Sequence, residues 1–416
     1  MTDVTDAPMF NPFEEGFFED PREQFALLRD QNPVHLSPVG VWMVFRYQDC
    51  FDILRDPELS VDYNRVVELN PDAAQERLDQ FSDALGEQAP QSPRDRRSML
   101  NIDPPDHTRI RRLLSKVFTP RRVEELRPMV QRLVDGILTK MESKDEAELI
   151  SDLAFPLPFA VISEMLGMPE GDSEELRSWS HAVVKTLDPI ISDTEVREAF
   201  TAGAAMESHI SEVIEWKRKN LSDDILSALI TAEEDGDRLS LEELIDQVVL
   251  LFVAGHETTV NLIGNGTYRL LQHPDQLQLL RDNPDLIQSA VEELLRFDSP
   301  VQLSRRITLK TASFAGTEVP AGTFVMTCLG SANHDPEQFG PNAHELDIRR
   351  ENASRHLSFG SGVHHCLGAA LARIEGQVAI GSLVQRFPKL AVADGSGNWN
   401  GRIVLHGLDT LNVTLG

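Results

Sequence analysis

The most informative stretch of the sequence is His356-Leu-Ser-Phe359-Gly360-Ser-Gly362-Val-His364-His365-Cys366-Leu-Gly368. Apolar side chains recur at helical spacing directly after it, which predicts a helix that starts just beyond Cys366. The positive end of a helix and its free N–H groups stabilise a sulfur anion, so we expect a lowered pKa for Cys366. The glycines let the backbone approach a flat ligand closely. A thiolate held in this way can ligate iron. The apolar positions of the predicted helix are Leu371, Ile374, Val378 and Leu383.

Cys366 has other interpretations when it is taken alone. A buried structural cysteine or a lone redox thiol is the usual role of a single cysteine. A zinc site needs more Cys or His ligands at short spacing. His364 and His365 lie two residues and one residue before Cys366, which is awkward for one tetrahedral metal ion, and Cys50 and Cys328 have no CxxC spacing.

Composition excludes several classes of protein. The chain has 416 residues with 39 basic and 67 acidic side chains, so the net charge is 39 − 67 = −28. Such an acidic chain is a poor partner for nucleic acid or an anionic membrane. Three cysteines cannot build a disulfide framework, the acidic N-terminus does not resemble a signal peptide, and we find no apolar run long enough for a membrane anchor. We therefore expect a cytoplasmic protein.

The pattern along the chain predicts a mainly α fold, with a large helical body around one long central helix and a smaller β-rich part. No Gly-, Ser- or Pro-rich linker divides the chain, so we expect a single domain over residues 1–416. Ser240 with Glu243 forms a capping box that starts the long helix, which could run to Gln272. The β-leaning parts lie near 33–62, 301–365 and 388–416, and β-formers at 34–36 and 41–45 between turn residues indicate a small hairpin in the first of them. The helical body covers about 104–300 and 367–387, with further helices expected over 106–118, from 120 onward and from 283 to 297.

The spacing Phe-Gly-x-Gly-x-His-x-Cys-x-Gly, from Phe359 to Gly368, resembles the haem-binding loop of the cytochromes P450. This resemblance implies the cytochrome P450 fold and haem b as the cofactor. It further implies that Cys366 is the metal ligand, donating a thiolate that favours O–O cleavage. Phe359 and Gly360 are then cofactor-binding residues.

A second motif, Ala254-Gly255-His256-Glu257-Thr258-Thr259, interrupts the long apolar helix. Taken alone, its threonines predict only a helix that bends where hydroxyls bond back to carbonyls. The motif is similar to the oxygen-activation motif of the same family. The resemblance implies that Ala254 and Gly255 line the cofactor and leave room for dioxygen. It implies catalytic roles for Thr258, whose hydroxyl contacts the reduced oxygen, and for Glu257, which feeds protons from solvent.

Three further residues match structural positions of the family. An i, i+3 pair such as Glu293 and Arg296 is usually a surface ion pair of little energetic value. Here the pair resembles the family's Glu-x-x-Arg motif, which bonds a downstream arginine, and Arg350 is the best-aligned third member.

The cations that would bind the haem propionates come from three segments. The stretch 106–111 is similar to the propionate-binding helix of the family, and its predicted cofactor-binding residues are spaced i, i+4. A surface cation is the ordinary interpretation of each such residue taken alone. The candidates are His107, Arg111, Arg306 and His364, with His356 as a weaker one.

The resemblance implies a haem-thiolate monooxygenase that hydroxylates or epoxidises an apolar small molecule of the macrolide, terpenoid, steroid or fatty-acid class. The chain has no flavin or iron–sulfur signature, so electrons would come from a separate ferredoxin or flavodoxin. The basic stretch Arg109–Arg122, which contains no acid, is the expected docking face, although such a stretch can also serve only solubility.

The substrate pocket is expected to include Val253, Val301, Gln302 and Leu303, with contributions from 64–100, 172–218 and the turn at 405–408. Other functions on the same scaffold are a peroxygenase or a nitric oxide reductase. A haem sensor without turnover is the alternative from a different class.

Overall fold

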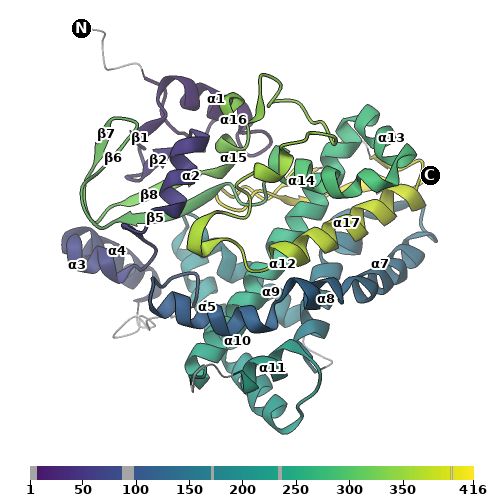
Figure 1. Cartoon of the computed structure of the whole chain (residues 1–416), viewed down its shortest axis with the longest axis horizontal. Coiled ribbons are helices and arrows are strands. Elements are labelled where there is room, and N and C mark those ends of the chain that lie inside the picture. Colours follow the sequence, from purple (N-terminus) through teal and green to yellow (C-terminus); the bar gives the residue numbers. More distant parts are fainter. Residues whose placement is uncertain (1–6, 87–97, 170–172, 233–236, 394, 396) are drawn as a thin grey trace.

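A computed structural model of the chain describes residues 7–86, 98–169, 173–232, 237–393, 395 and 397–416. Helices form most of it, and a five-stranded sheet lies at one side (Figure 1). This arrangement confirms the expected mainly α fold with a smaller β-rich part. The helices are α1 Arg22–Gln31, α2 Tyr47–Arg55, α3 Asn64–Leu69, α4 Pro71–Leu85, α5 Asp106–Val117, α6 Pro120–Glu124, α7 Arg127–Met141, α8 Pro156–Leu166, α9 Ser173–Val184, α10 Asp193–Lys219, α11 Ile225–Thr231, α12 Leu241–Gln272, α13 Pro274–Asp282, α14 Ile287–Phe297, α15 Leu329–Ala332, α16 Pro336–Phe339 and α17 Ala369–Arg386.

The strands form four small sheets. In the largest, the strand order is β1-β2-β8-β5-β3, and only the β2–β8 pair is parallel. The β1–β2 hairpin has Val34 opposite Val44, which confirms the hairpin expected from the sequence. The strands are β1 Val34–Leu36, β2 Trp42–Val44, β3 Leu59–Ser60, β4 Glu146–Glu148, β5 Leu303–Thr308, β6 Ala312–Phe314, β7 Thr317–Val319, β8 Phe324–Cys328, β9 Ala391–Val392, β10 Asn398–Trp399, β11 Leu408–Thr410 and β12 Asn412–Thr414.

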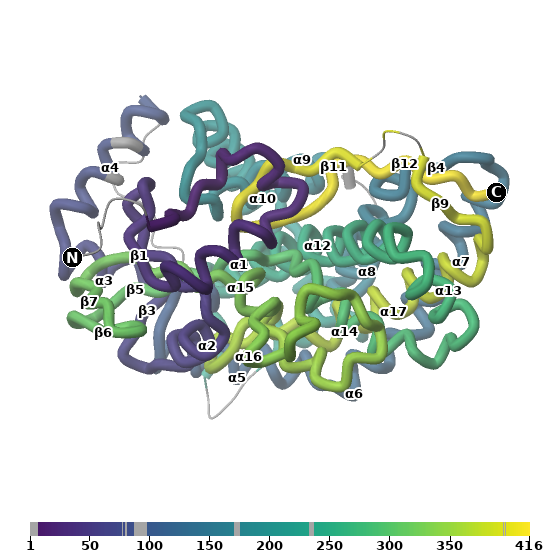
Figure 2. The backbone as a smooth tube through the Cα atoms, turned by 90° about the horizontal axis from the view of Figure 1, so that it is seen from above, coloured from purple at the N-terminus to yellow at the C-terminus, as the bar shows by residue number. Residues whose placement is uncertain are grey.

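The long helix α12 runs through the middle of the molecule (Figure 2). Ser240 caps it as predicted, because its hydroxyl accepts the N–H of Glu243 while the Glu243 carboxylate accepts the N–H of Ser240. The helix has 32 residues, or about 48 Å at 1.5 Å per residue. Its position makes it the element against which α8, α10, α14 and α17 pack.

Two hydrophobic clusters connect distant parts of the chain. The larger one joins α5, α7, α8, α12 and α17, and all four predicted apolar positions of α17 lie in it. The second joins Phe10 and Phe25 near the N-terminus to Cys328 on β8 and to Leu405 near the C-terminus. Of the helices described, none combines the length and apolarity needed to cross a bilayer.

The predicted borders of the β-rich part are only partly correct. The segment 33–62 contains α2, whose buried side chains Tyr47, Cys50, Ile53 and Leu54 follow a helical period among neighbouring β-formers. The segment 301–365 has no strand after Cys328, and β4 lies inside the expected helical body because it pairs with β12. Helices α1, α3 and α4 precede the body and were not expected. The expected helix start at Pro284 is a 3₁₀ turn that leads into α14.

Candidate active site

The cysteine loop is folded back onto itself and onto α14. The N–H of Cys366 donates to the carbonyl of Phe359 over 2.9 Å, and Ser358 donates its hydroxyl to the carbonyl of Leu295 over 2.7 Å. Gly362 has a φ of +70°, and a Cβ there would lie 2.6 Å from the carbonyl oxygen of Leu54. Only glycine therefore fits at this position, and the loop delivers Cys366 to the N-terminus of α17.

Cys366 is an exposed residue, although the surrounding protein atoms are close enough to desolvate its sulfur. Burial raises the pKa of Cys366 above its usual value, so the expected lowering is wrong for the protein alone. The N–H groups of Gly368 and Ala369 and the guanidinium groups of Arg111 and Arg373 do act in the predicted direction, but desolvation outweighs them. A metal ion deprotonates a coordinating thiol directly, so this pKa does not prevent ligation.

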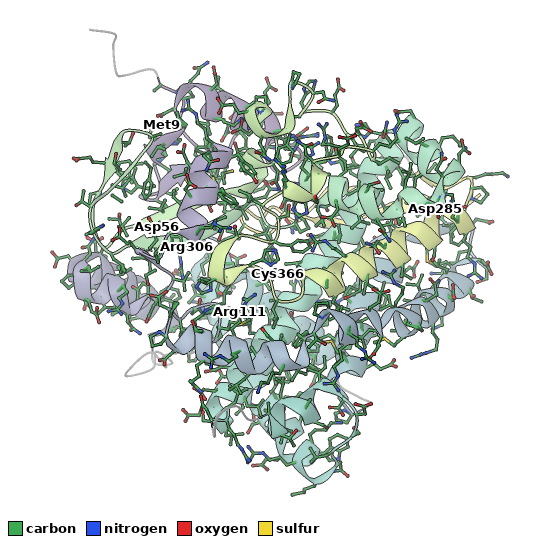
Figure 3. All side chains as sticks on the ribbon, in the orientation of Figure 1. Met9, Asp56, Arg111, Asp285, Arg306 and Cys366 are labelled. Carbon is green, nitrogen blue, oxygen red and sulfur yellow. The ribbon has the colours of Figure 1, made fainter. Side chains whose placement is uncertain are left out.

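A group of four cationic or imidazole side chains lies beside the cysteine loop. Arg111 donates to the carbonyl of His365 over 2.6 Å, and the rings of His107 and His364 are 4.2 Å apart. The charge of Arg306 acts on His364, and Figure 3 shows Arg306, Arg111 and Cys366 in the same part of the molecule. The structure thus brings together the four predicted propionate partners.

This group contains buried polar atoms that the described protein atoms leave unsatisfied. Both ring nitrogens of His107 are buried without a hydrogen-bond partner among the described residues. Arg306 is 5% exposed and donates to the carbonyls of Arg305 and Leu54 and to the hydroxyl of Ser304. Burial lowers the pKa of Arg306 to about 10 and that of His107 to about 4. Asp103 acts on both groups through its charge, but Arg306 forms no ion pair with an acid among the described residues. A buried cation of this kind fits an anionic ligand such as the carboxylates of haem.

Phe359 and Gly360 form the turn at the start of the loop. The guanidinium of Arg373 lies 4.5 Å from the centre of the Phe359 ring, and Arg373 also donates to Glu292 at 2.5 and 3.0 Å. Gly360 has a φ of +67° and open space where a Cβ would be. His356 lies apart from the propionate group, because its Nε2 faces the Glu292 carboxylate at 3.3 Å.

On α12, the small residues of the second motif form an accessible face in the middle of an otherwise buried helix. Ala254 and Gly255 are exposed, and a Cβ on Gly255 would meet only the Ile162 side chain, at 3.8 Å. Thr258 donates its hydroxyl hydrogen to the carbonyl of Ala254 over 2.8 Å, and Thr259 does the same to Gly255. The Thr258 oxygen therefore keeps lone pairs free to accept a hydrogen bond.

Glu257, which follows these small residues in the motif, is 8% exposed. Burial raises its pKa; Arg402 and Arg177 lower it, and Asp409 raises it further. Its nearest described basic group is the ring of His181 on α9, with 3.8 Å between Nδ1 and Oε1. Glu257 is thus a buried acid with a half-exposed imidazole beside it.

The three predicted structural residues lie together. Glu293 accepts two hydrogen bonds from Arg296 and one of 3.1 Å from Arg350. Arg296 also donates to the carbonyls of Asn333 and Ala343, both over 2.8 Å. This buried network ties α14 to the loops that lead into the cysteine segment.

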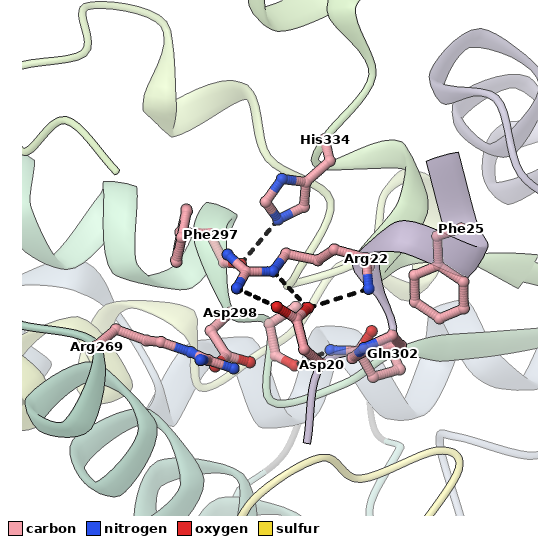
Figure 4. Close-up of a pocket in the computed structure, with 11 residues that line it drawn as sticks. Asp20, Arg22, Phe25, Arg269, Phe297, Asp298, Gln302 and His334 are labelled. Carbon is pink, nitrogen blue, oxygen red and sulfur yellow. Dashed lines mark hydrogen bonds and ion pairs between the residues drawn. The ribbon is translucent and has the colours of Figure 1, made fainter. Parts of the chain in front are cut away.

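Three of the four predicted pocket residues belong to one hydrophobic cluster, and the fourth, Gln302, lies apart. Val253 and Val301 are partly buried against the same hydrophobic cluster, while Leu303 is fully inside that cluster. Gln302 turns the other way and donates to the carbonyl of Ser299 over 2.7 Å. It lines a small pocket with Arg269 and Asp298 (Figure 4). Of the other expected contributors, residues 87–97 and 172 lie outside the described residues.

Acids from elsewhere in the chain meet the basic stretch Arg109–Arg122. Arg109 pairs with Glu243 and Asp237, and Arg122 pairs with Asp223. Of the six basic residues of the stretch, Arg111 turns inward, while Arg112, Lys116 and Arg121 are exposed. The excess of positive charge on this stretch is therefore smaller than the sequence indicates. The acids that neutralise it come from distant parts of the chain, so they cannot be seen in the stretch itself.

Sequence reasoning missed four residues of this region. Glu292 and Arg373 pack around the cysteine loop, and His181 and Arg402 pack around Glu257. Arg373 lies seven residues after Cys366, which places it two turns along the helix and is a usable signal. His181 and Arg402 are 221 positions apart and carry no such signal.

Comparison with known proteins agrees with this geometry. A family model for cytochrome P450 matches residues 64–396. The cytochrome P450 monooxygenase PikC of Streptomyces venezuelae is 42% identical over 96% of this chain and 92% of its own length. The vitamin D(3) 25-hydroxylase of Pseudonocardia autotrophica is 40% identical over 97% and 96%. The solved structure of P450BioI in complex with hexadec-9Z-enoic acid ligated acyl carrier protein has a TM-score of 0.85 and 35% identity, and covers 96% of this chain and 98% of that chain.

Proposed function

The chain belongs to the cytochrome P450 family, and we propose that it inserts one oxygen atom of dioxygen into an apolar small molecule by hydroxylation or epoxidation. The observation that carries this proposal is the position of Cys366. Its sulfur lies at the start of α17, beside a buried cationic group and a loop that requires glycine.

We propose haem b as the cofactor, and when bound it supplies the reduction of dioxygen and the oxygen transfer. Cys366 would donate its sulfur to the iron. His107, Arg111, Arg306 and His364 would bind the two carboxylates. This would give His107 the hydrogen-bond partner that it lacks among the described residues and would give the buried Arg306 an ion-pair partner. Phe359, Gly360, Ala254 and Gly255 would contact the ring of the cofactor.

Glu257 and Thr258 are proposed as the proton-handling pair. Reducing one oxygen atom of dioxygen to water consumes two protons, which must reach a site that excludes bulk water. Thr258 has an acceptor oxygen on the accessible face of α12. Glu257 is adjacent in sequence and buried, and its raised pKa increases the fraction that carries a proton near neutral pH.

The proposed substrates belong to the macrolide, terpenoid, steroid or fatty-acid class. Val253 and Val301 offer apolar side chains at the edge of a hydrophobic cluster. Two similar proteins, a vitamin D(3) 25-hydroxylase and P450BioI, which was solved with a fatty acid carried by acyl carrier protein, support a large apolar ligand.

We further propose that a ferredoxin or flavodoxin donates electrons at the exposed cations of α5 and α6. Arg112 and Lys116 are exposed on the helix whose Arg111 contacts the cysteine loop. An acidic donor would approach this face under electrostatic attraction. A single domain over residues 1–416 acting in the cytoplasm completes the proposal, and the hydrophobic cluster that joins Phe10 to Leu405 supports one packed unit.

The experiment is a spectrum of the reduced protein under carbon monoxide, for the wild type and for Cys366→Ser. The wild type should show the far-red-shifted Soret band of a thiolate ligand, and the variant should lose that band. Candidate ligands are then screened by the change from low to high spin, and products are analysed after turnover under labelled dioxygen. A wild-type protein without the shifted band contradicts the proposal, and so does a product whose new oxygen comes from water or peroxide.

A further inference from the structure

His181 on α9 lies between an acid and a guanidinium group. Its Nδ1 is 3.8 Å from Oε1 of Glu257, and its Nε2 is 3.2 Å from a terminal nitrogen of Arg402. The His181 side chain is 46% exposed, whereas that of Glu257 is 10% exposed. The ring therefore stands between the buried carboxyl group and water.

The contact with Arg402 determines which ring nitrogen carries the proton. A guanidinium group can only donate hydrogen bonds, so Nε2 of His181 must accept. In the neutral ring the hydrogen is then on Nδ1, the nitrogen that faces Glu257. The remaining gap of 3.8 Å is longer than a hydrogen bond, and a small movement of the ring or one bridging water would close it.

Burial and the charges around His181 lower the pKa of its ring. Desolvation lowers its pKa first, followed by the positive charges of Arg402, Lys185 and Arg177, while Asp409 on β11 raises it. Arg402, Asp409 and Arg177 also act on Glu257, and His256 lies 4.0 Å from its other carboxylate oxygen. The Nε atom of Arg402 is buried and has no hydrogen-bond partner among the described residues, and its charge also acts on the carboxylates of Asp188 and Glu195.

We propose that His181 is the outer carrier that passes protons from water to Glu257, and that Arg402 is a positioning residue that sets its tautomer. This inference rests on the proton-handling role proposed for Glu257. When Arg402 withdraws, a solvent proton adds to Nε2 of His181, and the Nδ1 proton moves to Oε1 of Glu257. The ring is left neutral with its proton on Nε2, and exchange with water returns the original tautomer. One proton enters and one leaves, and no electron is transferred.

The first experiment compares His181→Asn, Glu257→Gln and the control His209→Asn in the holoenzyme with its electron donor. His209 lies on the neighbouring helix α10 and its ring contacts Trp179, so the control removes a nearby histidine away from Glu257. We expect His181→Asn to slow coupled turnover about tenfold and to increase the solvent deuterium isotope effect, with an unchanged substrate-induced spin shift. His209→Asn should match the wild type.

The outcomes separate this inference from the proposed function. If Glu257→Gln is impaired and His181→Asn behaves as the wild type, the outer-carrier role is wrong while the proposed function stands. If Glu257→Gln itself turns over normally with an unchanged isotope effect, the proposed proton-handling role fails, and the His181 inference fails with it. A loss of the spin shift in His181→Asn also overturns the inference, because it shows a role in substrate binding.

The second experiment examines Arg402→Gln without relying on activity alone. Nitrogen NMR of the reduced, carbon monoxide-bound protein should show His181 with its proton on Nδ1 in the wild type and in mixed tautomers in the variant. Removing the charge also raises the His181 pKa, so the alkaline limb of the pH profile of coupled turnover should move to higher pH. This shift of the alkaline limb should be absent from the double variant that combines Arg402→Gln with His181→Asn. If the shift persists in the double variant, it arises from Glu257, and the proposed role of His181 is wrong.

Discussion

Arg296 donates two hydrogen bonds to the Glu293 carboxylate, at 2.6 and 2.7 Å, where neither side chain has any exposed surface. The same carboxylate accepts from Arg350 and from the N–H of Asp347. Since every guanidinium hydrogen bond of Arg296 not made to Glu293 goes to a loop carbonyl, this pair determines the path of the chain between α14 and the cysteine segment.

Glu293→Gln should strongly destabilise the protein. The change leaves two buried guanidinium groups without their acid, and breaking a buried ion pair costs about 3–5 kcal/mol. Thermal unfolding and the fraction of protein that retains haem measure the effect. Glu125→Gln is the control, because Glu125 pairs with Arg121 at the surface and its loss should change little. A Glu293→Gln variant as stable as this control would contradict the structural role.

Gly362→Ala should lower both stability and haem content. An L-residue in the left-handed region costs about 1–2 kcal/mol, and here the new methyl group also meets the Leu54 carbonyl oxygen at 2.6 Å. Gly40→Ala is a matched control, since Gly40 has a φ of +78° and open space where the methyl group would lie. The difference between the two melting temperatures measures the contact alone. Equal losses would show that the loop yields to the methyl group.

Arg306→Leu should weaken haem retention while leaving the sheet intact. Arg306 is a buried cation on β5, and losing a charge-assisted hydrogen bond of about 1.5–3 kcal/mol corresponds to about 10- to 100-fold faster release. The rate of haem transfer to apomyoglobin measures this. Arg305→Leu is the control, because adjacent residues of a strand point to opposite faces and Arg305 packs over Phe324. Equal rates of haem release from the Arg306→Leu and Arg305→Leu variants would contradict a role for Arg306 in binding the propionates.

Glu375→Gln should change how stability depends on pH. Glu375 on α17 is buried, and burial alone raises its pKa to about 8. The folded protein then holds a proton that the unfolded chain releases above about pH 4.3, so stability falls as pH rises from there to about 8, by about 4 kcal/mol at pH 7. Melting temperatures of the variant should be flatter than those of the wild type between about pH 5 and pH 8. Parallel curves would contradict this account.

The sequence predicts well those elements whose signals are local. The cap at Ser240, the hairpin around Val34 and the helix after Cys366 depend on residues within a few positions of one another, and the structure contains all three. The helix α2 was missed because its short apolar period lies among β-formers. The strand β4 was missed because its partner, β12, lies more than 260 residues further along the chain.

In the candidate site too, features with a local sequence signal could be predicted, whereas features set by long-range contacts could not. The motif residues that were named from the resemblance lie where distant segments meet, but spacing could not place Gln302, whose side chain turns to Ser299. Spacing in the sequence also could not predict that Arg109 pairs with Glu243 or that His181 contacts Arg402, because the partners of each pair are far apart along the chain. The pKa of Cys366 was expected to fall because helix and amide effects are visible in sequence, whereas the degree of burial is not.

The carbonyl of Leu54 is contacted by Arg306 and faces Gly362, so one turn of α2 helps to build a loop more than 300 positions later. During synthesis this turn of α2 is made early, whereas the residues that it contacts in the site are made only after most of the chain. The nascent polypeptide therefore has no complete haem cradle until the ribosome has passed Cys366.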